Sequence, residues 1–153
     1  MIFRKITSVE KIKLVLGECA STFYNKAICN ETVIDNLADK YNRYAEFYCC
    51  FIEDIIIGCI AFYSNDENKH IGFLSMIIVK KEYQAKGVGK KLLGLCIEKC
   101  IQRGMEKLRL EVNKNNINAI NFYKKIDGII IGEKEDSFIM EIMLKDKLLI
   151  SGE

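Results

Sequence analysis

Apolar residues recur at helical spacing along the first part of the chain, after a short opening strand, MIFRKI. Thr7 and Glu10 have the spacing of a capping box, which satisfies free backbone donors at the start of a helix. The inward face of this first predicted helix consists of Val9, Ile12, Leu16 and Cys19. A second helix is predicted over residues 31–42, with an inward face of Val33, Ile34, Leu37 and Tyr41.

From residue 46 the pattern changes to apolar runs that have the length of buried strands. EFYCCFI and IIIGCIAFY are joined by a turn at Glu53 and Asp54, which predicts a β-hairpin. SNDENK predicts another turn, and residues 70–79 predict a third strand. These three strands would form a meander.

The rest of the chain alternates helices with strands. A helix is predicted over residues 88–103, with Gly104 as its left-handed cap. KLRLEV is a predicted strand, NNINAINFYKK a short helix, and GIII and FIMEIML two closing strands, while the residues after Lys145 stay unassigned. The order β-α-α-β-β-β-α-β-α-β-β predicts an α/β fold of mixed α+β type, with helices on both faces of one mixed sheet. The inward face of the 88–103 helix would consist of Val88, Leu92, Leu95, Cys96 and Cys100.

Composition places the chain among ordinary globular proteins, because half of its residues are apolar and 29% are charged. At 153 residues we expect a single domain over residues 1–153. The net charge of +2 gives no global reason to expect a nucleic-acid partner, and no apolar run approaches the ~20 residues of a membrane span. MIFRKITSVEK turns charged at once, so we expect no signal peptide and a cytoplasmic protein.

The seven cysteines do not have the spacing of a metal site or of a disulfide framework. No C-x-x-C occurs, and the sequence holds one histidine. We therefore expect no metal and interpret the cysteines as reduced thiols in the core. None has a histidine plausibly beside it, which disfavours a cysteine nucleophile.

The stretch VKKEYQAKGVGKKLL, residues 79–93, has the features of a phosphate-binding loop. It leads from a buried strand into an amphipathic helix, whose first backbone N–H groups and positive dipole end attract anions. Gly87 and Gly89 would let a phosphate reach those groups, and Gln84 can hydrogen-bond across the loop. A run of lysines alone is more often a solvated surface, so the strand and helix on either side carry the prediction. The lysines are Lys80, Lys81, Lys86, Lys90 and Lys91.

Two other phosphate loops do not fit these residues. A Walker loop needs Ser or Thr after its lysine, and here Lys90 is followed by Lys91. A dinucleotide fingerprint needs a third glycine where Leu92 stands.

The chain resembles the GNAT superfamily of acyl-CoA-dependent N-acetyltransferases. Gln84, Gly87 and Gly89 match the family's loop, [QR]-x-x-G-x-[GA]. Downstream, LEVNKNNINAINFYKK is similar to the family's second motif, and the order of elements agrees over nearly the whole chain. Asp127-Gly128 is a departure, because the family usually has Gly-Phe there. The residues that match the second motif are Asn116, Ala119, Phe122 and Tyr123.

The resemblance implies a site for acetyl-CoA. The strand at residues 77–79 would splay from the strand at residues 108–112, so that the pantetheine arm pairs with the backbone of Ile77 and Val79. Asn116 would hydrogen-bond that arm. Pyrophosphate would bind the backbone N–H groups of the loop. The implied cofactor-binding residues are Ile77, Ile78, Val79, Gln84, Ala85, Lys86, Gly87, Val88, Gly89, Lys90, Asn116, Ala119, Phe122 and Tyr123.

The implied activity is acetyl transfer from acetyl-CoA to a primary amine within a ternary complex. Neutralising an amine of pKa about 10.4 at pH 7 costs roughly 4.6 kcal/mol, so a base or a water relay must take its proton. Glu111, at the end of a central strand, is the first candidate for the base, although it could be a mere edge charge or bind the acceptor. A backbone N–H near Val79 would stabilise the oxyanion. The other candidates for the base are Glu53, Asp54, His70, Ser75 and bulk water.

Tyr123 would face the CoA sulfur, stabilise the departing thiolate by a hydrogen bond and protonate it late. Its phenol, of pKa about 10, is a weak acid toward a thiol of pKa about 8.5. A core aromatic is the alternative interpretation, because Phe122 and Tyr123 could both be packing residues.

Two other functions stay open. The chain could be a non-catalytic acyl-CoA-binding module, or an anion-binding α/β domain unrelated to acyl-CoA. The acceptor could be a protein amine, an amino sugar, a polyamine or an aminoglycoside, and nothing in the first 45 residues chooses among them. We expect no nucleic-acid or membrane partner, and a monomer or homodimer. The acidic residues Glu31, Asp35 and Asp39 hint only weakly at a cationic acceptor.

Overall fold

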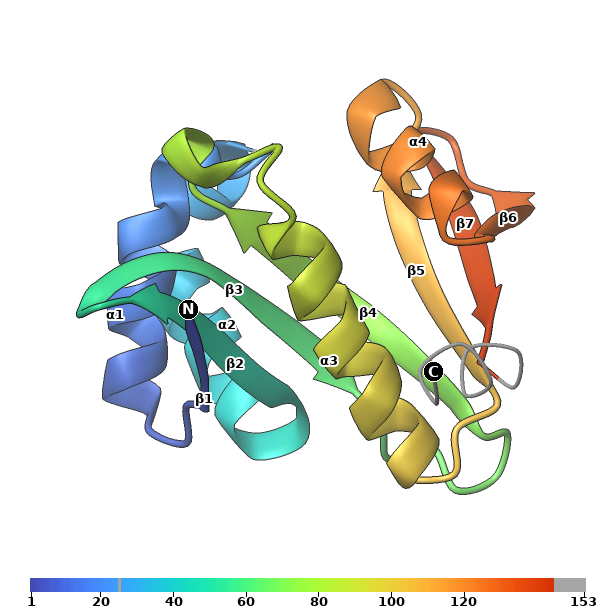
Figure 1. The fold of residues 1–153 in the computed structure, drawn as a ribbon, viewed down its shortest axis with the longest axis horizontal. Helices are drawn as coiled ribbons and strands as arrows, with labels where there is room; N and C mark the ends of the chain where they lie inside the picture. The colour runs from blue at the N-terminus through green and yellow to red at the C-terminus, as the bar shows by residue number, and fades with distance from the viewer. Residues whose placement is uncertain (25, 145–153) are drawn as a thin grey trace. The chain divides into compact units, whose positions relative to one another are not determined.

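The computed structural model describes residues 1–24 and 26–144. Seven strands form one sheet in the order β1-β2-β3-β4-β5-β7-β6, and helices flank it (Figure 1). This confirms the expected mixed α/β fold and the order of its main elements. The strands are β1 (Ile2–Lys5), β2 (Glu46–Ile52), β3 (Ile55–Tyr63), β4 (Ile71–Val79), β5 (Lys107–Asn113), β6 (Ile129–Glu133) and β7 (Ser137–Met143). The α-helices are α1 (Val9–Cys19), α2 (Glu31–Tyr44), α3 (Val88–Gln102) and α4 (Ile117–Lys125).

The chain divides into two compact units. The first contains Met1–Phe62 and Met76–Leu95, and the second contains Tyr63–Ser75 and the chain from Cys96 onward. β4 and α3 each contribute residues to both units. The two units are described separately below.

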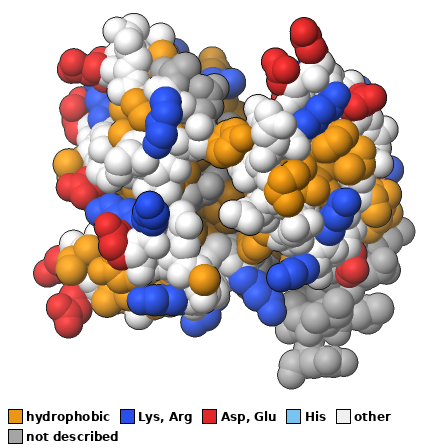
Figure 2. Space-filling view, turned by 90° about the horizontal axis from the view of Figure 1, so that it is seen from above, with side chains coloured by type: hydrophobic (Ala, Val, Ile, Leu, Met, Phe, Trp, Pro, Cys, Tyr) orange, Lys and Arg blue, Asp and Glu red, His pale blue; other side chains and the backbone are white. Residues whose placement is uncertain are grey.

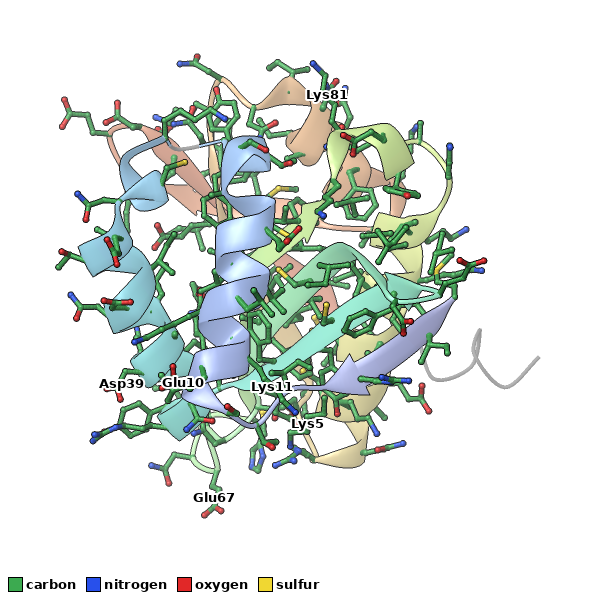
Figure 3. The ribbon with its side chains drawn as sticks, turned by 90° about the vertical axis from the view of Figure 1, so that its left-hand side faces the viewer. Lys5, Glu10, Lys11, Asp39, Glu67 and Lys81 are labelled. Carbon is green, nitrogen blue, oxygen red and sulfur yellow. The ribbon has the colours of Figure 1, made fainter. Side chains whose placement is uncertain are left out.

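In the first unit, β1, β2 and β3 form an antiparallel ladder, and α1 and α2 lie side by side (Figure 3). The capping box expected at Thr7 and Glu10 is wrong. Ser8 is the N-cap residue, in an extended conformation, and its hydroxyl accepts a hydrogen bond from the backbone N–H of Lys11 at 3.4 Å. Both Thr7 and Ser8 can cap a helix, so the sequence pattern fixed this boundary only to within one residue.

Three short 3-10 segments connect the elements of this unit, and the apolar periodicity predicted none of them. They are Ala20–Thr22, Lys26–Cys29 and Lys81–Tyr83. The second helix also runs to Tyr44 rather than ending at residue 42.

In the second unit, β4 pairs with β5 in parallel over Ile71–Leu74 and Lys107–Leu110. β7 runs antiparallel to β5 and lies between β5 and β6. Gly104 has φ 82°, which confirms the expected left-handed end of α3. Hydrophobic side chains gather on the surface of this unit (orange, right side of Figure 2). Its exposed large hydrophobic residues are Ile117, Ile129, Ile130, Ile131 and Met143.

The part of the sequence left unassigned after Lys145 lies outside the described residues. Within the described part, no helix is both long and apolar enough to cross a bilayer.

Candidate functional site

The loop between β4 and α3 presents bare backbone at the start of a helix. Ala85 and Gly87 have φ values of 63° and 84°, and Val88 is the first residue of α3. A Cβ atom added to Gly87 would have no neighbour within 4 Å, so the space beside its backbone is open. Left-handed residues in such a turn direct successive N–H groups toward one point, which makes an anion nest.

Gln84 holds the loop in this shape. Its side-chain Nε2 donates a hydrogen bond to the backbone oxygen of Val79 at 2.9 Å, which confirms the hydrogen bond expected across the loop. The bond joins the last residue of β4 to the turn that precedes α3. The loop geometry is therefore fixed by the protein itself.

The lysines around this loop divide into two groups. Lys81, Lys86, Lys90 and Lys91 are exposed, with the Lys86 ammonium 5.7 Å from the centroid of the Tyr83 ring. Lys80 is instead part of the packing, because its ammonium pairs with Glu18 at 2.9 Å and its backbone N–H donates to Ile57 O at 2.8 Å. The exposed lysines thus provide positive charge beside the loop.

The backbone at Ile78 and Val79 lies very close to β3. A Cβ atom added to Gly58 would lie 2.6 Å from the backbone oxygen of Ile78 and 3.3 Å from the Cα of Val79. Only glycine fits this approach without a shift of one strand. The prediction did not include Gly58, although a lone glycine inside an apolar strand pattern is a recognised signal for close backbone contact.

The first unit also contains a cavity of about 710 Å³ next to the loop. The end of α1, the start of β3 and the segment after β4 form its walls. Of its lining residues, only Gln84 was a predicted site residue. The others are Glu18, Ser21, Thr22, Ile55, Lys80, Lys81, Glu82 and Tyr83.

In the second unit, Tyr123 is buried near the end of α4, with 6% of its surface exposed. Burial, and secondarily the Cys96 thiolate, raise the pKa of Tyr123 well above its ordinary value. A Cβ atom at Gly128 would lie 2.7 Å from the Tyr123 backbone oxygen, which accepts a hydrogen bond from the Gly128 N–H at 2.8 Å. Asp127 has φ 66° and turns the chain back at the end of α4. The Asp127-Gly128 pair, which departs from the family's usual Gly-Phe, therefore packs its backbone against that of Tyr123.

The remaining second-motif residues also lie on α4 or at its start. Asn116 is the N-cap residue, and its Oδ1 accepts a hydrogen bond from the Ala119 N–H at 3.2 Å. Phe122 is half-buried, with its ring edge-on to Tyr123 at 5.3 Å. Asn116 thus has a structural role, while its amide nitrogen stays available as a donor.

Glu111 is exposed near the end of β5, where its Oε1 accepts a hydrogen bond from Lys134 Nζ at 2.6 Å. The alternative candidates for the base are dispersed. Glu53 and Asp54 form the β2–β3 turn of the first unit, whereas Ser75 and His70 belong to the second. His70 lines a separate cavity of about 310 Å³.

Each unit therefore holds one part of the predicted site. The first brings together Ile77, Ile78 and Val79 with the loop from Gln84 to Lys90, and the second brings together Asn116, Ala119, Phe122 and Tyr123. Over residues 1–24 and 26–144, no group of three or more His, Cys, Asp or Glu side chains is placed to hold a metal ion.

Among solved structures, the chain is similar to the PaiA N-acetyltransferase from Thermoplasma acidophilum in complex with coenzyme A. Their TM-score is 0.75 at 20% identity, over 94% of this chain and 99% of that one. The ribosomal-protein-S18-alanine N-acetyltransferase from Escherichia coli has a TM-score of 0.74 at 16% identity, over 94% of each chain. At these identities the likeness concerns the fold.

Among curated relatives, an uncharacterized N-acetyltransferase of Methanocaldococcus jannaschii is 29% identical over 84 residues, which are 52% of this chain and 37% of that protein. N-alpha-acetyltransferase 30 of Saccharomyces cerevisiae is 30% identical over 74 residues, which are 46% of this chain and 42% of that protein. The thialysine N-epsilon-acetyltransferase of Bos taurus is 28% identical over 103 residues, which are 58% of this chain and 60% of that protein. The matches thus span less than two thirds of these relatives. The model of the Acetyltransferase (GNAT) family matches residues 17–128, so the chain belongs to the GNAT acetyltransferase family.

Proposed function

We propose that this protein is an N-acetyltransferase that moves an acetyl group from acetyl-CoA to a primary amine by direct attack in a ternary complex. The observation that carries this proposal is the open, left-handed turn at Ala85 and Gly87, at the start of α3 and held to β4 by Gln84. Membership of the GNAT family supports catalysis rather than binding alone, as do Tyr123, which matches the family's second motif, and Glu111, the candidate base.

The residues present fit the cofactor. The backbone N–H groups from Gln84 to Lys90 would hold the pyrophosphate, because the space beside Gly87 is open and exposed lysines stand next to it. The backbone of Ile77 and Val79 would pair with the pantetheine amides. Asn116 would use its amide nitrogen as a donor, since its oxygen caps α4.

When bound, acetyl-CoA supplies the activated acetyl group and a thiolate leaving group. Glu111 would take the proton of the amine through its second oxygen, because Lys134 engages Oε1. A backbone N–H near Val79 would stabilise the oxyanion. Tyr123 would stabilise the thiolate first by donating a hydrogen bond and would transfer its proton only late. Burial raises the pKa of its phenol, which makes early transfer of the proton less favourable than from an ordinary tyrosine.

We also propose that residues 1–153 work as one catalytic domain in the cytoplasm, as a monomer or homodimer. The single domain is supported by β4 and α3, each of which belongs to both units. The cytoplasmic location is supported by the seven cysteines, which are all thiols rather than halves of disulfides.

Thermal unfolding tests the cofactor. The protein is heated in buffer alone and with acetyl-CoA, CoA or ATP, and a ligand at 100 times its Kd should add about 2.7 kcal/mol to the free energy of unfolding. We expect a rise in Tm with both CoA species and none with ATP. Gly87→Ala should reduce the rise, because φ 84° strains a side chain there and the added methyl group occupies the open space beside the backbone, whereas Gly94→Ala on the exposed face of α3 should keep it. An equal rise with ATP would instead support an anion-binding domain unrelated to acyl-CoA.

Turnover is then measured against peptides, lysine, polyamines, amino sugars and aminoglycosides. Released CoA should be separated by chromatography rather than detected with a thiol dye, because the protein itself carries seven thiols. Binding of CoA with no acetylated product from any amine would favour the non-catalytic module.

A further inference from the structure

The side chain of Lys134 places a primary ammonium directly on the candidate base. Its Nζ lies 2.6 Å from Oε1 of Glu111, which makes the contact a hydrogen bond as well as an ion pair. Lys134 follows the last residue of β6, and Glu111 belongs to β5. β7 lies between these two strands in the second unit, so the lysine side chain reaches across it (Figure 1).

The turn between β6 and β7 holds the backbone of Lys134 in place. The Lys134 N–H donates to the backbone oxygen of Ser137 at 2.8 Å, which closes the turn. From the end of β5, the N–H of Lys114 donates to the backbone oxygen of Asp136 at 2.9 Å, and its ammonium pairs with Glu133 at 2.8 Å. The side chain of Lys134 therefore starts from a fixed backbone position.

The ion pair between Lys134 and Glu111 is open to exchange. The Lys134 side chain is 59% exposed and that of Glu111 is 40% exposed. Exposed ion pairs contribute little to the free energy of unfolding, because water and salt screen the charges and holding two long side chains costs entropy. Stability alone thus gives little reason for this contact, and other groups can replace either partner.

The contact matches what the proposed reaction requires of an acceptor. A general base must lie within about 2.6–3.2 Å of the group whose proton it takes. The Lys134 Nζ is a primary amine nitrogen at such a distance from the proposed base. Lys114 provides a contrast, because its ammonium pairs with Glu133, which is not a candidate base. Both lysines are ion-paired in the same unit, and the identity of the carboxylate distinguishes them.

We propose that Lys134 is an internal acceptor, whose Nζ the protein acetylates when acetyl-CoA is bound. Glu111 takes one proton from the ammonium, the nitrogen forms a bond to the carbonyl carbon of the thioester, and the C–S bond breaks. The nitrogen then loses a second proton and the departing sulfur takes up one, so that the products are an N-acetyllysine and CoA. Glu111 passes its proton to water, and no further reactant is needed. This internal transfer rests on the proposed function, with Glu111 as its base.

Acetylation changes the site that carries it out. The amide nitrogen of acetyl-lysine has no positive charge, so the ion pair between Lys134 and Glu111 is lost. Both carboxylate oxygens of Glu111 then become available to the amine of an external acceptor.

Incubation of the whole protein with acetyl-CoA, in a buffer without primary amines, tests the internal transfer. Trypsin does not cleave after acetyl-lysine, so acetylation of Lys134 replaces the peptides 126–134 and 135–145 by one peptide over 126–145. Mass spectrometry at successive times gives the rate at each lysine. Lys134 should react on the order of 10²-fold faster than Lys114 and the exposed Lys125, which report the uncatalysed reaction. The rate per molecule should not change on dilution of the protein, because donor site and acceptor belong to one chain.

Two variants separate the base from the acceptor. Glu111→Gln keeps the shape of the side chain but cannot take a proton, so acetylation of Lys134 should fall on the order of 10²-fold. Lys134→Arg keeps a cation beside Glu111 and should show no selective acetylation of any lysine. In the unmodified protein, acetylation of Lys134 no faster than that of Lys125 would overturn the inference, and so would a rate per molecule that rises with protein concentration.

External amines in a parallel sample distinguish a failure of the internal transfer from a failure of the proposed function. An acetylated external amine without selective acetylation of Lys134 would overturn the internal acceptor alone. No acetyl transfer to Lys134 or to any external amine would overturn both.

Discussion

At Gly58 the backbone of β3 leaves no room for a side chain, and the atoms in the way belong to the backbone of β4. They are the oxygen of Ile78 and the Cα of Val79, in the segment proposed to pair with pantetheine. Backbone atoms cannot rotate aside as a flexible side chain can. A single methyl group at Gly58 would therefore act on stability and on the shape of the proposed site together.

Gly58→Ala should lower the free energy of unfolding by about 1–3 kcal/mol, the usual cost of overpacking, and weaken CoA binding. Gly94→Ala is the matched control, because this exposed helical position has no neighbour within 4 Å of an added Cβ atom. It should be neutral or stabilising by up to about 1 kcal/mol. Thermal unfolding with and without CoA measures both effects, and an unchanged Tm in Gly58→Ala would contradict the close approach.

Tyr123→Phe removes the phenol while keeping the ring that packs in the second unit. If Tyr123 stabilises the thiolate, kcat should fall on the order of 10²-fold, with a much smaller change in KM for acetyl-CoA. Steady-state kinetics measure both constants, and Tyr44→Phe on the exposed end of α2 is the control. Turnover equal to that of the unmodified enzyme would remove Tyr123 from the mechanism.

At the scale of elements, the N-cap residue of α4, Asn116, has a structural role and a proposed binding role. Asn116 accepts the Ala119 N–H through its oxygen, and its nitrogen is the proposed donor to the cofactor. Because the two roles use different atoms of one amide, substitution can separate them. The carboxylate of an aspartate can cap the helix as asparagine does, but it has no N–H to donate.

Asn116→Ala should lower the free energy of unfolding by about 1 kcal/mol through loss of the cap. Asn116→Asp should keep the Tm of the free protein and raise the Kd for CoA. Thermal unfolding and calorimetric titration test the two variants together. An Asn116→Asp protein with an unchanged Kd would show that Asn116 only caps α4.

The main elements were predictable from the sequence because their signals are local. The run from Val88 to Gly104 contains both the apolar stripe of α3 and the glycine that ends it, and the β2–β3 hairpin surrounds an obvious turn. The ion pair between Glu18 and Lys80 joins residues far apart in the sequence. No local pattern encodes such a contact, which depends on how α1 packs in the folded unit.

At the scale of the whole molecule, β4 and α3 tie the two units together covalently, since each runs from one unit into the other. If one half of β4 or α3 unfolds, the backbone hydrogen bonds and side-chain packing that support the other half are lost as well. The proposed single domain should therefore unfold cooperatively, as most domains of this size do.

Hydrogen exchange followed by mass spectrometry across a urea series tests this cooperativity. Peptides from β2 in the first unit and from β5 in the second should lose protection at the same urea concentration. Peptides from β4 serve as the internal control, because this strand belongs to both units. Different midpoints for β2 and β5 would mean that residues 1–153 contain two independently folding parts.

The left-handed turn at Ala85 has a consequence for the speed of binding. A residue with a side chain loses roughly 1–2 kcal/mol in this conformation, and the Gln84 hydrogen bond to the Val79 backbone oxygen supports the turn from within the protein. If this support holds the turn in shape before binding, a ligand meets a preformed site. Association should then be limited by diffusion and orientation, and the cofactor and its analogues should differ mainly in how long each one stays bound.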